Sequence, residues 1–177
     1  MVLGAVARKR IRVTGVVQGV GFRPFVARLA DELGLAGLVG NDAAGVFIEV
    51  QGPPVQLDDF LGRLRDDAPP LAVIEQVVVH ELEALEPLRP LGAAGPGTAF
   101  RIVGSRSAAG PSTLIPPDVA TCDQCMEDVL DPSDRRHRYP FTNCTNCGPR
   151  FTIIRSLPYD RPATSMAGFP MLSLIHI

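Results

Sequence analysis

The chain has 177 residues, 46% of them hydrophobic, with 17 Lys and Arg against 19 Asp and Glu and a net charge of −2. This length suits one well-packed core and a small second module, and the near-neutral charge argues against a dedicated nucleic-acid-binding protein. No apolar run has the length of a membrane span, and the order of the first residues is the reverse of a secretory signal peptide. We therefore expect a cytoplasmic protein with neither nucleic acid nor a membrane as its partner.

The first hundred residues predict one α+β domain. Ile11 and Val13 alternate with polar residues, as in a half-buried strand, and apolar residues then recur at helical spacing until Gly34. Further strands are expected over 37–41, 46–50, 73–82 and 99–103, with a second amphipathic helix over 57–64. The order β-α-β-β-α-β predicts a ferredoxin-like sandwich with both helices on one face of an antiparallel sheet. Residues 84–98, which contain Gly and Pro, predict a loop or a lengthened hairpin.

A glycine-rich stretch, Gly15 to Arg23, directly follows the first strand and opens into the first helix. Such a loop can point several backbone N–H groups at one spot, and the positive end of the helix dipole adds to them. The Arg23 guanidinium is suited to bidentate contact with phosphate oxygens. The stretch therefore predicts a phosphate pocket. The alternative is a tight turn beside a surface charge.

Gly15 to Arg23 resembles the signature loop of the acylphosphatases, and Gly37 to Asn41 is similar to that family's Gly-x-x-x-Asn segment. The resemblance implies that Arg23 and Asn41 are catalytic, with Asn41 positioning the attacking water. It also implies that the phosphoryl group is bound by the residues of the loop, namely Gln18, Gly19, Val20, Gly21, Phe22 and Arg23. Phosphoryl transfer requires mainly positioning and electrostatic stabilisation, which this set could supply. Asn41 has an alternative role in ordinary turn chemistry before Ala43-Ala44-Gly45.

The stretch from Ser105 to Pro117, rich in Ser, Ala, Gly and Pro, predicts a linker. All four cysteines follow it, and Cys122 and Cys125 are separated by eighteen residues from the second pair, Cys144 and Cys147. Two such pairs can close a tetrahedral thiolate site, so we expect zinc as the cofactor. Disulfides, with three possible pairings, and a redox-active pair are the alternatives, and a cytosolic setting disfavours disulfides.

The two parts in this order resemble the N-terminal part of the HypF-type carbamoyltransferases of nickel–iron hydrogenase maturation. The flanking stretches 138–153, 158–162 and 164–171 are similar to that family as well. We divide the chain accordingly into an acylphosphatase-like domain (8–104), the linker (105–117), a four-cysteine zinc-finger module (118–171) and a tail (172–177). The family has a further cysteine where this chain has Leu172, so we interpret 172–177 as a non-native tail of a truncated chain, with a naturally short protein as the alternative.

The resemblance implies that the first domain hydrolyses carbamoyl phosphate to carbamate and phosphate. In the family, ATP then activates the carbamate in a further domain, and the carbamoyl group passes to the C-terminal cysteine of a hydrogenase-maturation partner protein. We expect those later steps to need domains that this chain lacks. Two alternatives remain open: a stand-alone acylphosphatase with a zinc appendage, and a non-catalytic zinc-dependent interaction module.

Overall fold

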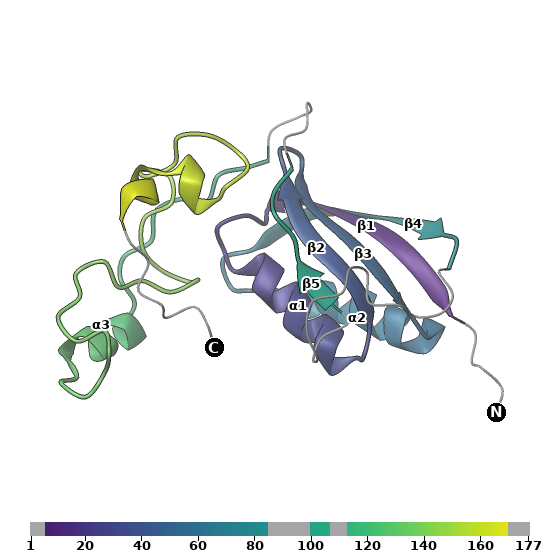
Figure 1. The fold of residues 1–177 in the computed structure, drawn as a ribbon, viewed down its shortest axis with the longest axis horizontal. Coiled ribbons are helices and arrows are strands. Elements are labelled where there is room, and N and C mark those ends of the chain that lie inside the picture. Colours follow the sequence, from purple (N-terminus) through teal and green to yellow (C-terminus); the bar gives the residue numbers. More distant parts are fainter. Residues whose placement is uncertain (1–5, 85–99, 107–112, 170–177) are drawn as a thin grey trace.

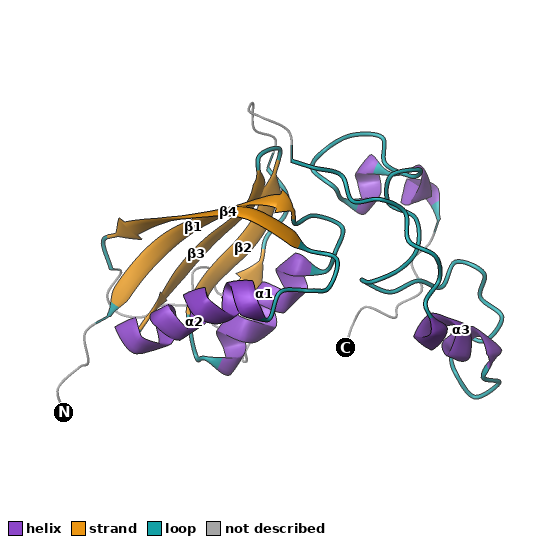
Figure 2. Ribbon diagram, turned by 180° about the vertical axis from the view of Figure 1, so that it is seen from behind, coloured by secondary structure: helices purple, strands orange, loops and turns teal. Residues whose placement is uncertain are grey.

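In a computed structural model, the structure describes residues 6–84, 100–106 and 113–169. The first part is a five-stranded sheet in the order β4-β1-β3-β2-β5. Helices α1 (Phe22–Glu32) and α2 (Pro54–Asp66) cover one of its faces (Figures 1 and 2). The strands are β1 (Ala7–Val16), β2 (Ala36–Asp42), β3 (Gly45–Gly52), β4 (Val73–Leu82) and β5 (Phe100–Ile102). The predicted ferredoxin-like α+β fold is confirmed.

One pairing in the sheet differs from the prediction. The sheet is antiparallel except between β2 and β5, which run parallel with Gly37 opposite Phe100. The reason is topological: β3 and β4 both run antiparallel to β1, and β2 and β4 therefore point in opposite directions. β5 runs opposite to β4 and pairs with the edge of β2, and the two strands are therefore parallel. Residues 85–99, which include most of the predicted loop, lie outside the described residues.

The core lies between the sheet and the two helices. Sheet residues such as Ile11, Val39 and Ile48 are fully buried there against Leu29 and Phe60 of the helices. Burial of each such side chain stabilises the fold by about 1.5–3 kcal/mol. Strand alternation places Arg10, Arg12 and Glu49 on the other face, together with Phe47.

The second part has little regular structure. It contains α3 (Asp123–Leu130) and the short 3₁₀ helices η1 (Arg161–Ala163) and η2 (Ser165–Gly168), with isolated bridges between Val119 and Gly148 and between Ile154 and Thr164. It lies beside the sheet domain (Figure 1). Its buried residues include Cys125, Cys147 and Arg150. A module with so few buried apolar side chains needs another source of stability, which a metal site can supply.

The described ends of the predicted linker pack on the first domain. The Arg106 N–H donates to the Asn41 carbonyl oxygen at 2.9 Å, and the Thr113 hydroxyl donates to the Gly15 carbonyl oxygen at 2.9 Å. The boundaries at 104 and 118 stay our proposal. Residues 107–112 of the linker and the predicted tail, 172–177, lie outside the described residues.

Candidate functional site

The glycine-rich loop between β1 and α1 has the backbone that an anion site requires. Gly19 and Gly21 have φ of 71° and 76°, values that side chains with a Cβ rarely adopt. Gly21 is the N-cap of α1, and its carbonyl oxygen accepts the N–H of Phe25 at 3.1 Å. No side chain caps this end of α1 in the described part of the chain. The first-turn N–H groups are therefore left for a ligand or solvent, at the positive end of the helix dipole.

The Gln18 side chain anchors this loop to the turn between β2 and β3. It is 1% exposed, and its Nε2 donates to the carbonyl oxygens of Asp42 at 2.7 Å and Gly45 at 2.9 Å. Its Oε1 accepts the N–H of Tyr159, from the second module, at 2.8 Å. Both side-chain polar atoms of Gln18 are thus used to fix the loop. Gln18 can therefore bind an anion only through its backbone N–H.

Arg23, in the first turn of α1, reaches the second module. Its Nη2 lies 2.7 Å from Oδ1 of Asp160, and its Nη1 donates to the Ser105 hydroxyl at 3.5 Å. The Ser105 hydroxyl in turn donates to the other carboxylate oxygen of Asp160. The Arg23 and Asp160 side chains are 23% and 28% exposed. The guanidinium is therefore paired with a carboxylate of the second module and stays partly accessible to solvent.

Asn41, near the end of β2, has a buried amide without a partner. The residue is 1% exposed, and neither Oδ1 nor Nδ2 makes a hydrogen bond within the described part of the chain. A buried, unsatisfied amide costs about 1–3 kcal/mol, so its presence needs an explanation such as a ligand. The turn chemistry that offered an alternative is supplied by Asp42, whose Oδ1 accepts the Ala44 N–H at 2.9 Å.

Contacts place the Asn41 segment beside Arg23. Val39 is buried in the core between sheet and helices, and strand alternation places Asn41 on that same, helix-covered face. Ser105 contacts the Arg23 side chain, while the next residue, Arg106, bonds to the Asn41 carbonyl oxygen. The two predicted catalytic residues are thus connected through the consecutive residues Ser105 and Arg106.

A separate cavity of about 230 Å³ lies on the other face of the sheet, lined by Arg10, Arg12, Asp42, Phe47, Glu49 and Arg106. Its charges satisfy one another: Arg12 lies 2.6 Å from Asp42, Arg10 lies 3.0 Å from Glu49, and the Arg106 guanidinium lies 4.4 Å from the centre of the Phe47 ring. Because it contains neither the glycine loop nor Asn41, it is not the predicted anion site.

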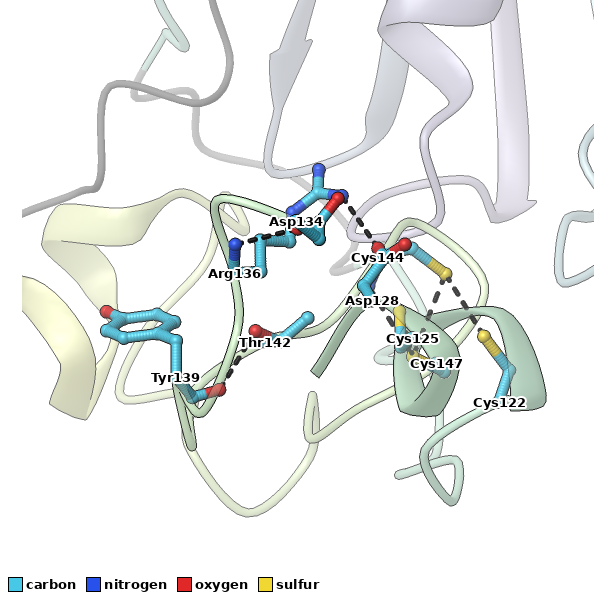
Figure 3. A network of polar contacts seen from close by, with 9 residues as sticks. All are labelled: Cys122, Cys125, Asp128, Asp134, Arg136, Tyr139, Thr142, Cys144 and Cys147. Atoms are coloured by element: carbon cyan, nitrogen blue, oxygen red, sulfur yellow. Dashed lines mark hydrogen bonds and ion pairs between the residues drawn. The ribbon is translucent and has the colours of Figure 1, made fainter. Parts of the chain in front are cut away.

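The four cysteines gather into one group in the second module. Cys122 and Cys125 lie at the start of α3, and Cys144 and Cys147 come from a turn that faces it (Figure 3). All four Sγ atoms lie within 4.8 Å of one another, with separations of 3.8 Å (Cys122–Cys144), 3.7 Å (Cys144–Cys147) and 3.6 Å (Cys125–Cys147). A disulfide requires about 2.05 Å. The cysteines are free, so the disulfide alternative is wrong and the metal-binding prediction is supported.

The surroundings of the sulfurs favour a metal as well. The backbone N–H of Asn146 donates to Sγ of Cys144 at 3.3 Å, and that of Cys144 to Sγ of Cys147 at 3.5 Å. Burial raises the pKa of Cys147, but hydrogen bonds from the backbone N–H groups of Cys144 and Cys122 and from neighbouring thiols outweigh it and bring that pKa down to about 7. Burial and its thiol neighbours raise the pKa of Cys125. Four close sulfurs cannot all ionise without a cation between them, and a bound divalent metal supplies that charge.

The loop between the cysteine pairs is closed by its own ion pair. Nη1 of Arg136 lies 2.7 Å from Oδ2 of Asp128, and the Arg136 N–H donates to Oδ1 of Asp134 at 2.7 Å (Figure 3). At the base of this loop the Tyr139 carbonyl oxygen accepts the Thr142 hydroxyl at 2.9 Å. Part of the basic stretch 135–138 thus serves to hold the module together.

Arg150 makes an extensive set of polar contacts around the second cysteine pair. It is 2% exposed, and its guanidinium donates to the carbonyl oxygens of Cys144, Thr145, Cys147 and Gly148. Its Nε donates to a fifth carbonyl oxygen, that of Gly19 in the glycine loop, at 3.0 Å. Arg150 therefore joins the two candidate sites directly.

Residues that contact the loop but were not predicted as site residues from the sequence include Ser105, Arg150, Tyr159 and Asp160. Three of them lie in stretches whose only signal is a resemblance to a family. No local pattern links them to the loop, because each contact with it joins residues 82 to 141 positions apart.

Comparison with known proteins agrees with both halves of the structure. The family profile described as Acylphosphatase matches residues 9–89, and the HypF finger profile matches residues 121–154. An acylphosphatase from Caldivirga maquilingensis is 42% identical over 86 residues, which are 48% of this chain and 90% of that protein. The chain therefore belongs, through its first domain, to the acylphosphatase family.

The particular arrangement of domain and finger is that of HypF. The carbamoyltransferase HypF2 of Cupriavidus necator is 53% identical over 164 residues, or 92% of this chain and 19% of that protein. The crystal structure of full-length HypF in the phosphate- and nucleotide-bound form has a TM-score of 0.86 at 42% identity, covering 97% of this chain and 21% of its own. The predicted resemblance to HypF-type carbamoyltransferases is confirmed. The chain spans about a fifth of the length of these relatives.

No helix among the described residues is long and apolar enough to cross a membrane.

Proposed function

We propose that the first domain hydrolyses carbamoyl phosphate to carbamate and phosphate, with Arg23 and Asn41 as catalytic residues. The backbone of Gln18 to Phe22 and the Arg23 guanidinium bind the phosphoryl group, and the Asn41 amide orients the attacking water. The observation that carries this proposal is the pairing of an uncapped, glycine-rich helix start with a buried Asn41 amide that has no other partner among the described residues. In-line phosphoryl transfer needs a group that binds the phosphoryl oxygens and a group that orients the water, and these two features would supply them.

The comparisons support the substrate class. A relative that this chain covers almost completely is an acylphosphatase, and a solved HypF structure is described as phosphate-bound. Carbamoyl phosphate is itself an acyl phosphate, and the relatives of greater length are carbamoyltransferases. We therefore assign carbamoyl phosphate as the physiological substrate. The later steps, activation of carbamate with ATP and transfer to the C-terminal cysteine of a hydrogenase-maturation partner, belong in this proposal to regions of the relatives beyond this chain.

We propose zinc as the metal of the cysteine group. A tetrahedral site with Zn–S bonds of about 2.3 Å has S···S edges of about 3.8 Å, close to the separations seen here. Four thiolates are the donor set that structural zinc prefers. In this module the ion would have a structural role, since four protein ligands leave no open position for a substrate.

The test is release of phosphate from carbamoyl phosphate by the 177-residue chain, corrected for spontaneous decay, with acetyl phosphate as a second substrate. Arg23→Ala should lower kcat/KM by about 10³-fold or more, as loss of an arginine that stabilises transferred phosphoryl charge does. Arg28→Ala is the matched control, because Arg28 is exposed on the same helix. An inert parent chain that is folded and metal-loaded would favour the non-catalytic interaction module. Equal rates on both substrates would favour a general acylphosphatase.

A further inference from the structure

The glycine loop is contacted by the second module at four positions. Tyr159 bonds to the Gln18 side chain and packs on Gly19, where an added Cβ would lie 3.1 Å from the Tyr159 ring. Thr145 packs on Gly21, and Asp160 pairs with Arg23. The loop to which the proposed function assigns phosphate binding is therefore shaped from outside by residues 145–160 as well as by its own sheet.

The Arg150 contact bears on one specific amide of the loop. Its Nε donates to the Gly19 carbonyl oxygen at 3.0 Å. In a trans peptide the carbonyl and the next N–H point in opposite directions, so a fixed Gly19 carbonyl fixes the direction of the Val20 N–H, away from Arg150. The Val20 N–H is one of the amides assigned to the phosphoryl group. Arg150 therefore orients a phosphate donor without touching phosphate itself.

The other end of the same guanidinium holds the metal-binding turn. Four carbonyl oxygens of residues 144–148 accept from Arg150, and this turn carries Cys144 and Cys147. Besides Arg150, the turn is held by the bridge between Val119 and Gly148, while Thr145 and Asn146 are exposed. A metal bound by the four cysteines would fix the turn, and the turn fixes the guanidinium.

We propose that Arg150 is a positioning residue that couples metal binding at the four cysteines to phosphate binding by the Gly15–Arg23 loop. The proposal rests on the proposed function, because it assumes that the loop binds phosphate. Coupling between two sites is reciprocal: metal strengthens phosphate binding, and phosphate strengthens metal binding by the same factor.

The experiment measures inorganic phosphate affinity by calorimetry in the 177-residue chain, loaded with Zn²⁺ and after chelation, and follows the Val20 amide resonance by NMR. Chelation should weaken phosphate binding by about 5- to 150-fold, the usual range of coupling between sites, and shift the Val20 resonance. Saturating phosphate should tighten Zn²⁺ binding by the same factor. Equal phosphate affinity with and without Zn²⁺ would overturn the proposal.

Arg150→Lys separates the coupling from the metal site. Lysine keeps the charge but lacks the fork that reaches both the turn and Gly19. The variant should bind phosphate about 5- to 150-fold more weakly, the usual range of coupling between sites, with a shifted Val20 resonance. Arg155→Lys, at an exposed position of the same module, is the control and should match the parent.

Each remaining outcome decides the question. An Arg150→Lys chain with the parent's phosphate affinity, whether it keeps Zn²⁺ or loses it, overturns the coupling. One that loses Zn²⁺ and has the phosphate affinity of the chelated parent supports it. A Zn²⁺-loaded parent that neither binds phosphate nor hydrolyses acyl phosphates overturns the proposed function and the coupling with it, whereas failure of the coupling alone leaves hydrolysis intact.

Discussion

The Arg23 guanidinium and the Asp160 carboxylate lie 2.7 Å apart, although 137 positions separate them in the sequence. Arg23 belongs to the candidate phosphate site, and Asp160 belongs to the second module. If Arg23 binds phosphate as proposed, a carboxylate at this place would compete with phosphate for the same guanidinium, and its charge would repel a phosphate dianion.

Replacement of Asp160 by Asn should therefore strengthen phosphate binding. Both side chains are partly exposed, and such ion pairs contribute about 0–1 kcal/mol. Inhibition of acyl phosphate hydrolysis by inorganic phosphate should become about 3- to 10-fold stronger, by loss of both the competition and the repulsion. Asp58→Asn, at an exposed position of α2 and outside both candidate sites, is the control. Weaker inhibition by phosphate in Asp160→Asn, that is, a larger inhibition constant, would mean that the carboxylate orients Arg23 and does not compete with phosphate.

Asn41→Ala should lower turnover without loss of stability. The amide makes no hydrogen bond among the described residues, so its removal takes away a buried polar group and leaves no partner unsatisfied. We expect kcat to fall by about 10²-fold or more, the range for loss of one oriented polar group, with little change in the phosphate inhibition constant. The thermal midpoint should stay equal or rise. A drop in the midpoint together with unchanged kcat would remove Asn41 from the mechanism and assign it a structural role.

The sequence predicted those features that depend on local pattern. The strands and helices of the first domain follow from the spacing of residues such as Ile11, Val13 and Leu29, and the cysteine group follows from two matched pairs. The direction of β5 could not be read in this way, because it depends on which strand has a free edge. Arg150 and Asp160 could not be assigned either. In the distant loop, Arg150 contacts a carbonyl oxygen and Asp160 contacts a side chain. Every residue has a carbonyl oxygen, so a sequence pattern cannot show which one is contacted.

Removal of the metal should unfold the second module and leave the sheet domain folded. Structural zinc contributes about 10–16 kcal/mol in small thiolate modules, and this one has few buried apolar side chains to replace that contribution. The sheet domain has its own core between β1, β3 and the two helices. Hydrogen exchange after chelation should show fast exchange in α3 and retained protection in β1 and β3. Simultaneous loss of protection in both parts would contradict the proposed boundary.

Gly21→Ala should weaken phosphate binding by more than its loss of folding stability would explain. Gly34→Ala is the matched control. Both glycines have a left-handed backbone, with φ of 76° and 63°, and an alanine there costs about 1–2 kcal/mol. They differ in their surroundings, since a Cβ at Gly34 meets nothing within 4 Å, whereas one at Gly21 lies 2.7 Å from Cβ of Thr145.

Gly21→Ala should therefore lose at least as much stability in urea as Gly34→Ala. Only Gly21→Ala should bind phosphate weakly, because its methyl group pushes the loop away from the second module. Removal of the opposing Cβ tests this reason directly. The double variant Gly21→Ala/Thr145→Gly should recover part of the phosphate affinity, while Thr145→Gly combined with Gly34→Ala should show no such recovery. If the first pair proves additive, the contact between Gly21 and Thr145 does not shape the loop, and the strain of a left-handed alanine in the Gly21→Ala variant alone explains the loss.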